Sequence, residues 1–110
     1  MSGFVYLLHF EKPIAPGRHT CQHYIGYAAD LAARIQAHET GHGARITQVA
    51  RERGIRFQVA RLWHGDRGLE RRLKDRKEAP QLCPICGRGC AVGYAEEIPA
   101  EAIKDYLLAF

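Results

Sequence analysis

The chain has 110 residues, of which 46% are hydrophobic and 25% charged, and it contains no low-complexity tract. This composition excludes a disordered or fibrous protein, and the length is that of a single domain. The longest apolar run near the N-terminus, Phe4 to Leu8, is far shorter than the ~20 residues of a membrane-spanning helix and lacks the flanks of a signal peptide. We therefore expect a cytoplasmic protein that does not enter a membrane.

Positive charge is concentrated in the middle of the chain. The formal net charge is +4, but residues 45–77 contain 11 Lys or Arg and only 4 Asp or Glu. Residues 78–110 contain 2 basic and 5 acidic residues. A basic stretch of this kind favours a partner with a phosphate backbone, although charge runs also occur simply as solvated helix faces.

The first segments predict a hairpin of two strands. Residues 3–10 are apolar on both alternating faces, as in a central strand that is covered on both sides. Two prolines and a glycine interrupt residues 11–19, and an extended pattern resumes at residues 21–26. A loop of nine residues would join the two strands.

An amphipathic helix is predicted next. From Ala28 the apolar period changes to 3.6, and Leu31 and Ile35 form a face that packs inward. Asp30 is placed to cap this helix, and Gly41 is placed to end it.

A shorter helix, a strand and a third helix follow in chain order. Residues 46–50 have helical spacing and are followed by Gly54. Residues 55–64 alternate between apolar and polar side chains, which predicts a strand with one buried face. Asp66 can cap the third helix, which Pro80 prevents from continuing.

The order of these elements predicts an α/β fold. We expect a small central sheet of three strands, mixed or antiparallel, flanked by helices in the order β-β-α-α-β-α plus a C-terminal helix. Residues 1–80 would form the main domain. Residues 81–110 would pack on it as a cysteine-containing loop and a helix that opens near Pro99. The last helix has an apolar stripe formed by Ile103, Tyr106, Leu107 and Phe110.

Five residues carry candidate chemistry. The first strand contains Val5-Tyr6-Leu7 and the second contains Tyr24-Ile25-Gly26. Arg34 and His38 are one helical turn apart, which predicts that they project from the same face, away from the inward-packing one. Glu70 follows on the third helix.

This ordered set resembles the GIY-YIG nuclease superfamily over roughly residues 3–79. The first motif, Val5-Tyr6-Leu7, is a weak match, whereas the second, Tyr24-Ile25-Gly26, is intact. The remaining matching positions are Ala29, Asp30, Leu31, Arg34, His38, Gly41, Gly43, Ala44 and Glu70.

The resemblance implies a metal-dependent endonuclease that hydrolyses phosphodiester bonds in DNA, for example branched DNA in repair or recombination. It implies that Tyr6 and Tyr24 flank the scissile phosphate, Arg34 stabilises its charge, His38 supports the nucleophile, and Glu70 holds Mg²⁺ or Mn²⁺. The residues expected to contact nucleic acid are Gly26, Tyr27, Arg45 and Lys74. Sequence specificity would come from the chain's own loops, a homodimer or another protein partner.

Physical chemistry is consistent with these roles. Arginine stays charged and can hold two phosphate oxygens at once. A single carboxylate such as Glu70 suits Mg²⁺, which keeps most of its waters and takes further ligands from the substrate. A tyrosine with a pKa of ~10 is a poor base at neutral pH, so Arg34, His38 or the metal would have to lower that pKa. Between the two tyrosines, we favour Tyr6 as the base.

Departures from the family pattern favour an alternative. Many members have Lys or Thr after the second motif, where this chain has Tyr27, and several have an asparagine beyond the metal carboxylate, whereas this chain has none. A catalytically silent nucleic-acid-binding module would tolerate both differences. Separately, each residue has a structural alternative: Tyr6 and Tyr24 as core aromatics, and Glu70 as half of a helical ion pair with Lys74.

Two further patterns involve metal-ligand residue types. His38-Glu39-Thr40-Gly41-His42 matches the zinc-protease pattern H-E-x-x-H, but Gly41 ends the helix that such a site requires. Zinc is a better candidate at Cys83, Cys86 and Cys90, where a C-x-x-C pair has a third cysteine nearby. The fourth ligand would be one of Cys21, His9, His19 and His23. Reduced thiols in a tight loop are nevertheless favoured over bound zinc. A further alternative function is a zinc-stabilised interaction protein in which the cysteine loop and the C-terminal stripe bind a partner.

Overall fold

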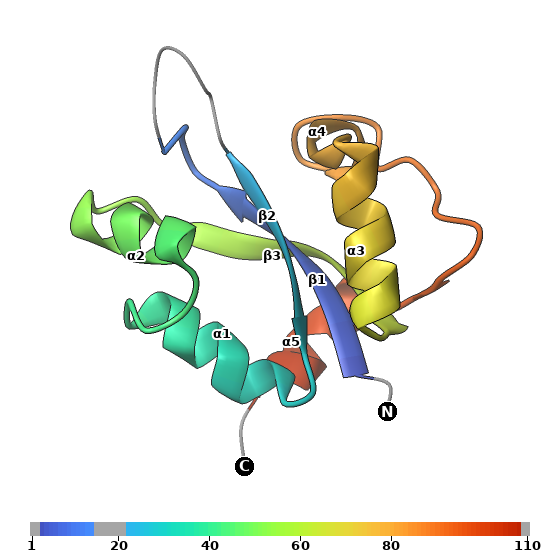
Figure 1. Ribbon diagram of the computed structural model, residues 1–110, viewed down its shortest axis with the longest axis horizontal. Coiled ribbons are helices and arrows are strands. Elements are labelled where there is room, and N and C mark those ends of the chain that lie inside the picture. Colours follow the sequence, from blue (N-terminus) through green and yellow to red (C-terminus); the bar gives the residue numbers. More distant parts are fainter. Residues whose placement is uncertain (1–2, 15–21, 109–110) are drawn as a thin grey trace.

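The computed structural model describes residues 3–14 and 22–108, which form an α/β fold around a four-stranded antiparallel sheet (Figure 1). The sheet order is β2-β1-β3-β4, so the strand expected to be central is central. The strands are β1 (Gly3–Phe10), β2 (His23–Ala28), β3 (Phe57–Gly65) and β4 (Glu96–Glu97). The α/β class is confirmed, whereas the expected number of three strands is wrong. β4 consists of two exposed glutamates, so it has none of the apolar alternation that predicts a strand.

Helices cover both faces of the sheet (Figure 1). One face packs against α1 (Leu31–Glu39), α2 (Arg45–Glu52), the 3₁₀ helix η1 (Ala100–Ala102) and α5 (Ile103–Leu107); the other packs against α3 (Arg67–Arg76) and α4 (Ala79–Leu82). Side chains alternate along β1, so Tyr6 and Leu8 face α1 while Val5 and Leu7 face α3. We call these the α1 face and the α3 face.

The β1–β2 hairpin is confirmed, and its register positions the side chains discussed below. Tyr6 pairs with Gly26, Leu8 with Tyr24, and His9 with His23. Tyr6 and Tyr24 therefore lie on the α1 face, and the two histidines lie opposite each other on the α3 face. Residues 15–19 of the expected connecting loop, and Cys21 at the expected start of the second strand, lie outside the described residues.

Helix α1 begins and ends as expected, but its inward face is wider. The Asp30 side chain accepts a hydrogen bond from the Ala33 N–H at 3.2 Å, and Gly41 follows the helix with a φ of 81°. His38 is fully buried on the same face as Leu31 and Ile35. The expected outward placement of His38 is wrong, because positions 31, 35 and 38 follow the i, i+4, i+7 spacing of one helix face.

Strand β3 is buried on both faces, so the expected single buried face is also wrong. Leu7 pairs with Arg61 and Leu8 with Val59, which leaves Ala60 as an extra residue in a β-bulge. The bulge breaks the period of two, which is why the alternation read from the sequence does not continue.

The C-terminal segment is more structured than expected. The expected cysteine-containing loop was to begin at Gln81, but Gln81 and Leu82 form the end of α4. The strand β4 comes after the loop and before the C-terminal helix. The expected helix opens at Pro99, and Ile103 on its stripe is buried, whereas Phe110 lies outside the described residues. No described helix is long and apolar enough to cross a membrane.

Candidate active site

Tyr6, His38 and Thr47 form a buried chain of hydrogen bonds on the α1 face. The Tyr6 hydroxyl lies 2.7 Å from His38 Nε2, and His38 Nδ1 lies 2.8 Å from Thr47 Oγ1. The Thr47 hydroxyl donates to the Ala44 carbonyl oxygen at 2.8 Å. Because this uses its single proton, Thr47 accepts from His38 Nδ1–H, and Nε2 is left to accept from the Tyr6 hydroxyl. The Ala44 N–H also approaches Nδ1, but at 3.4 Å this is the weaker contact.

Two glycines make room for the hydrogen-bonded side chains of Tyr6 and His38. A Cβ atom at Gly26 would lie 2.4 Å from the Tyr6 hydroxyl oxygen, and one at Gly43 would lie 2.1 Å from His38 Nδ1. Both distances are far below van der Waals contact, so any side chain would displace its neighbour. Gly26 therefore makes room for the Tyr6 ring.

The buried pair is neutral at pH 7 in the absence of substrate. Burial raises the pKa of Tyr6 to about 12, although a hydrogen bond from Arg34 acts in the opposite direction. Burial, with a smaller effect from the Arg34 charge, lowers the pKa of His38 to about 4. Without a metal, the pKa of Tyr6 is thus raised and not lowered, because the cost of burying a phenolate outweighs the effect of the Arg34 cation.

A cleft of about 550 Å³ lies at the β2 edge, between α1 and α3, and is lined by three of the five candidate residues. These are Tyr24 from β2, Arg34 from α1 and Glu70 from α3. Tyr6 is fully buried and does not line the cleft, but it interacts electrostatically with all three. The structure thus brings the five candidate residues together, and we call them the cleft site. Three of them line the cleft, and the buried pair of Tyr6 and His38 lies behind them.

Glu70 and Lys74 form an ion pair at the entrance to this site. Glu70 Oε2 lies 3.3 Å from Lys74 Nζ, which in turn lies 5.1 Å from the centre of the Tyr24 ring. Asp30, the other acidic residue lining the cleft, is occupied as the cap of α1. Glu70 is therefore the carboxylate that suits a divalent cation here, and a cation would compete with Lys74 for it.

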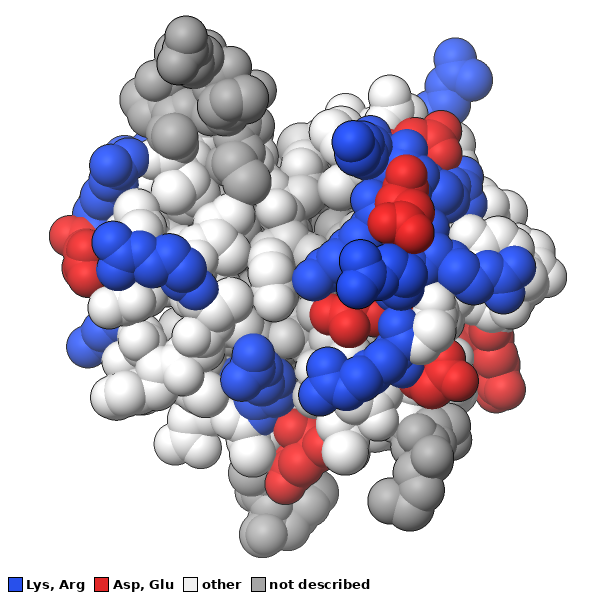
Figure 2. All heavy atoms as spheres, viewed as in Figure 1, with Lys and Arg blue, Asp and Glu red and all other residues white. Residues whose placement is uncertain are grey.

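Basic side chains flank a groove that continues from the cleft. A second cavity of about 520 Å³ is lined by Arg45, Lys74 and Lys77, and Tyr24 lines both cavities. Lys and Arg gather over α3, and others lie over the α1–α2 side, with a largely uncharged depression between them (Figure 2). Tyr27 lines the cleft, and the Arg67 guanidinium lies over its ring at 4.9 Å. Of the residues expected to contact nucleic acid, Tyr27, Arg45 and Lys74 thus line this groove.

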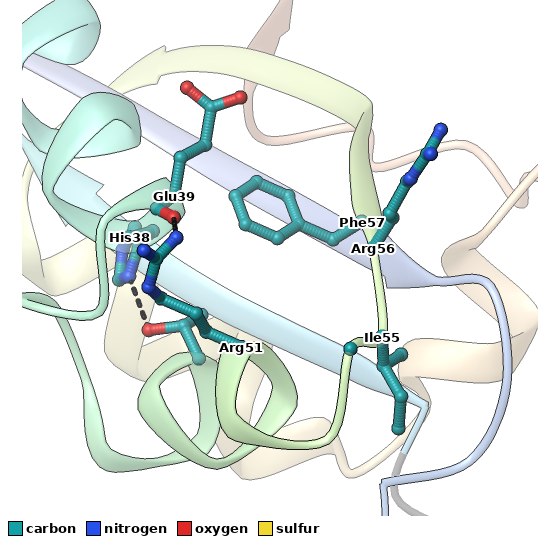
Figure 3. Close-up of a pocket in the computed structure, with 8 residues that line it drawn as sticks. His38, Glu39, Arg51, Ile55, Arg56 and Phe57 are labelled. Atoms are coloured by element: carbon teal, nitrogen blue, oxygen red, sulfur yellow. Dashed lines mark hydrogen bonds between the residues drawn. The ribbon is translucent and has the colours of Figure 1, made fainter.

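His38 also borders a third cavity, of about 370 Å³, on the side of α2 and β3 (Figure 3). Arg51 lies here and donates a hydrogen bond to the Glu39 carbonyl oxygen at 2.9 Å. Thr47 lines the same cavity and is the site residue that sequence reasoning missed. Its only sequence signal is a hydroxyl among apolar neighbours on the inward face of α2.

Four nitrogen and sulfur ligands form a separate group on the α3 face, which we call the His/Cys cluster. It comprises His9, His23, Cys83 and Cys86, whose ligand atoms all lie within 4.8 Å of one another, a grouping that could hold a metal ion. Burial, and then the neighbouring His9, lower the pKa of His23. Burial, and then Cys83, raise the pKa of Cys86. Cys90, expected as a third cysteine ligand, is not in the cluster, and His19 and Cys21 lie outside the described residues.

The H-E-x-x-H match does not form a metal site. His38 uses both ring nitrogens in the buried chain, and the positive φ of Gly41 ends the helix before His42. His42 Nδ1 instead lies 3.1 Å from the Thr40 hydroxyl.

In comparisons with protein families, curated proteins and solved structures, nothing matches this chain.

Proposed function

We propose that the protein is a metal-dependent endonuclease of the GIY-YIG type that hydrolyses phosphodiester bonds in DNA. The observation that carries the proposal is the grouping of the cleft site beside a groove flanked by basic side chains. The residues come from β1, β2, α1 and α3, so their convergence is a property of the fold rather than of one local motif. A cation, a carboxylate, phenols and a neutral imidazole can supply the charge stabilisation, metal binding and proton transfer that phosphodiester hydrolysis needs.

In this proposal, Arg34 binds the scissile phosphate. It borders the cleft and interacts with Tyr6 in the absence of substrate. A phosphate draws the guanidinium toward its own oxygens, because a charge-assisted pair with an anion is stronger than a hydrogen bond to a neutral phenol. The movement of Arg34 then opens Tyr6 to the cleft, and Tyr24 lies against the same phosphate.

Tyr6 and His38 carry the proton away from the attacking water. As the water oxygen forms its bond to phosphorus, Tyr6 accepts the water proton and passes its own proton to His38 Nε2. The bond to the leaving oxygen breaks, and that oxygen takes the electron pair and then a proton from solvent. The phosphate anion assists by raising the pKa of His38 from its low value of about 4.

Glu70 would hold the divalent cation. A bound Mg²⁺ or Mn²⁺ ion supplies Lewis-acid stabilisation of charge on the phosphate oxygens. Glu70 offers a carboxylate that is only 16% exposed and faces a cavity large enough for the waters that these ions retain. Neither ion suits the His/Cys cluster, whose nitrogen and sulfur donors favour zinc.

The test is cleavage of plasmid, single-stranded and branched DNA with Mg²⁺, Mn²⁺ or EDTA. We expect cleavage with either ion, none with EDTA, and a loss of at least ~100-fold for Glu70→Gln. Glu101→Gln is the matched control, because Glu101 is an exposed carboxylate in η1 outside the cleft. An unchanged cleavage rate in Glu70→Gln would remove the basis of the proposal.

A catalytically silent DNA-binding module is the second candidate. It is favoured by the complete burial of Tyr6, which keeps its hydroxyl out of the cleft in the substrate-free protein. Fluorescence anisotropy with labelled DNA separates the two functions, because a silent module binds DNA without cutting it under every metal condition. In either case, Arg45→Ala and Lys74→Ala should each reduce the salt dependence of binding by about one counterion.

A further inference from the structure

The His/Cys cluster has the dimensions of a tetrahedral metal site. His9 Nδ1 lies 3.4 Å from His23 Nε2, 3.5 Å from Cys83 Sγ and 3.3 Å from Cys86 Sγ. Zinc–nitrogen and zinc–sulfur bonds of ordinary length, set at tetrahedral angles, separate two nitrogens by about 3.4 Å and a nitrogen from a sulfur by about 3.6 Å. The three distances from His9 Nδ1 therefore match edges of a zinc tetrahedron, and all four ligand atoms lie within 4.8 Å of one another.

Two separate backbone segments, the β1–β2 hairpin and the turn after α4, position these four residues. His9 and His23 are directly opposite each other in the β1–β2 register, so the hairpin fixes the spacing of the imidazoles. Cys83 and Cys86 are held by a tight turn in which the Gly87 N–H donates to the Cys83 carbonyl oxygen at 2.8 Å. A Cβ atom at Gly87 would lie 2.4 Å from the Pro80 carbonyl oxygen, so this turn requires glycine.

Buried Arg61 fixes the same loop to β3. Its Nη1 donates to the Leu82 carbonyl oxygen at 3.1 Å and to the Cys90 carbonyl oxygen at 2.6 Å. Its Nη2 pairs with Glu97 Oε1 at 2.5 Å. A charged side chain that is only 4% exposed is costly to bury unless it is fully paired, and here it positions the loop that carries the cysteines.

We propose that His9, His23, Cys83 and Cys86 bind one zinc ion in a closed, structural site. Two imidazoles and two thiols form the Cys₂His₂ set that zinc prefers over the hard cations Mg²⁺ and Ca²⁺. Four protein ligands fill the tetrahedron and leave no position for a substrate, which makes the site structural rather than catalytic. The ion would join the N-terminal hairpin to the loop after α4, across more than 70 residues of chain. This inference does not depend on the proposed nuclease activity.

Metal analysis of the full chain, expressed without a metal-binding tag, tests the site. We expect one zinc per chain in the wild type and its loss in Cys86→Ser and His23→Gln. Cys90→Ser and His42→Gln are the matched controls and should keep the ion, because neither residue belongs to the cluster. A wild-type protein without zinc after growth in zinc-supplemented medium would overturn the proposal, as would zinc retained at full stoichiometry by both cluster variants.

Cobalt substitution tests the ligand set in the wild-type protein, even where a variant does not fold. Adding Co²⁺ to the metal-free, reduced chain should produce the intense visible absorption of tetrahedral cobalt and a near-ultraviolet band from thiolate ligands. Added Zn²⁺ should abolish both bands. A weak spectrum of hexahydrated cobalt would overturn the assignment, as would a Cys83–Cys86 disulfide that withstands reduction under native conditions.

Discussion

The two tyrosines of the cleft site and the two histidines of the His/Cys cluster lie on the same two strands but on opposite faces of the sheet. Tyr6 and Tyr24 point to the α1 face, whereas His9 and His23 point to the α3 face. The cleft site borders a cavity of about 550 Å³, so a ligand has room to enter it, and it contains one carboxylate. The His/Cys cluster brings four ligand atoms within 4.8 Å of one another, so it can close around a single ion.

If both proposals hold, this hairpin separates chemistry from stability by the alternation of its side chains. Changes at Arg34 and Glu70, which line the cleft, should alter the proposed DNA cleavage more than folding. Changes at the His/Cys cluster should alter folding first, because a structural ion contributes its binding free energy to the folded state.

Loss of the metal from the His/Cys cluster is expected to have the largest effect. Cys86→Ser, or chelation of the wild type, should lower the free energy of unfolding by about 4 kcal/mol relative to wild type with free zinc at about 1,000 times its Kd. For a domain of this size the Tm should fall by more than about 10 °C, measured by circular dichroism. Cys90→Ser should melt like the wild type. An equal Tm for Cys86→Ser and the zinc-loaded wild type would contradict a structural ion.

Removal of the Arg34 cation is expected to have the next largest effect, but on activity. Arg34→Ala should lower kcat by at least ~100-fold, or about 2.7 kcal/mol, because the phosphate loses its charged donor. Its Tm should stay within a few degrees of wild type, since Arg34 is only partly buried. Arg88→Ala removes the same charge from an exposed position in the cysteine loop and serves as the control. Retention of at least a third of wild-type kcat by Arg34→Ala would contradict the assigned role.

Local sequence signals predicted most of the fold. Asp30 and Asp66 cap α1 and α3 as expected, because a side-chain oxygen before an apolar period satisfies the first free N–H groups of a helix. The first strand was predicted because residues 3–10 place apolar side chains on both faces of an extended segment. These features depend on residues that are close together in the sequence, so they can be predicted without a structure.

Long-range pairing accounts for what the sequence did not reveal. The bulge at Ala60 depends on how β3 pairs with β1, and the two glutamates of β4 form a strand only because β3 lies beside them. Cys83 and Cys86 were recognisable from their spacing. The choice of His9 and His23 as their partners required the hairpin register, and the exclusion of Cys90 required the path of the loop.

The pH dependence of stability distinguishes the buried pair of Tyr6 and His38 from the rest of the molecule. The pKa of His38 is about 4 in the folded protein and ~6.5 in an unfolded chain. Between these pH values the unfolded state binds a proton that the folded state does not. The contribution of His38 to the free energy of unfolding is therefore complete well above pH 6.5 and is lost as the pH falls toward 4. The contribution is at most about 3 kcal/mol.

Urea denaturation of the wild type and His38→Gln at pH 7, 5.5 and 4.5 measures this contribution. Glutamine can keep a polar contact with Tyr6 but does not titrate, so the carboxylates and the His/Cys cluster contribute equally to both proteins. The stability gap between the two proteins should therefore change as the pH falls. Parallel losses of stability over this range would contradict a depressed His38 pKa.

Thr47 offers the smallest and most specific test, because its role is to position His38. Thr47→Val keeps the shape of the side chain but removes the acceptor of His38 Nδ1–H, which should cost about 1–2 kcal/mol. His38 can recover part of this loss by exchanging tautomers, so that Nδ1 accepts from the Ala44 N–H, now 3.4 Å away, and Nε2–H donates to Tyr6. Nitrogen chemical shifts of the imidazole report that exchange, and Thr47→Ser should restore the wild-type tautomer. If the valine variant kept Nδ1–H and full stability, Thr47 would not orient His38, and the proton of Tyr6 would lack a fixed acceptor.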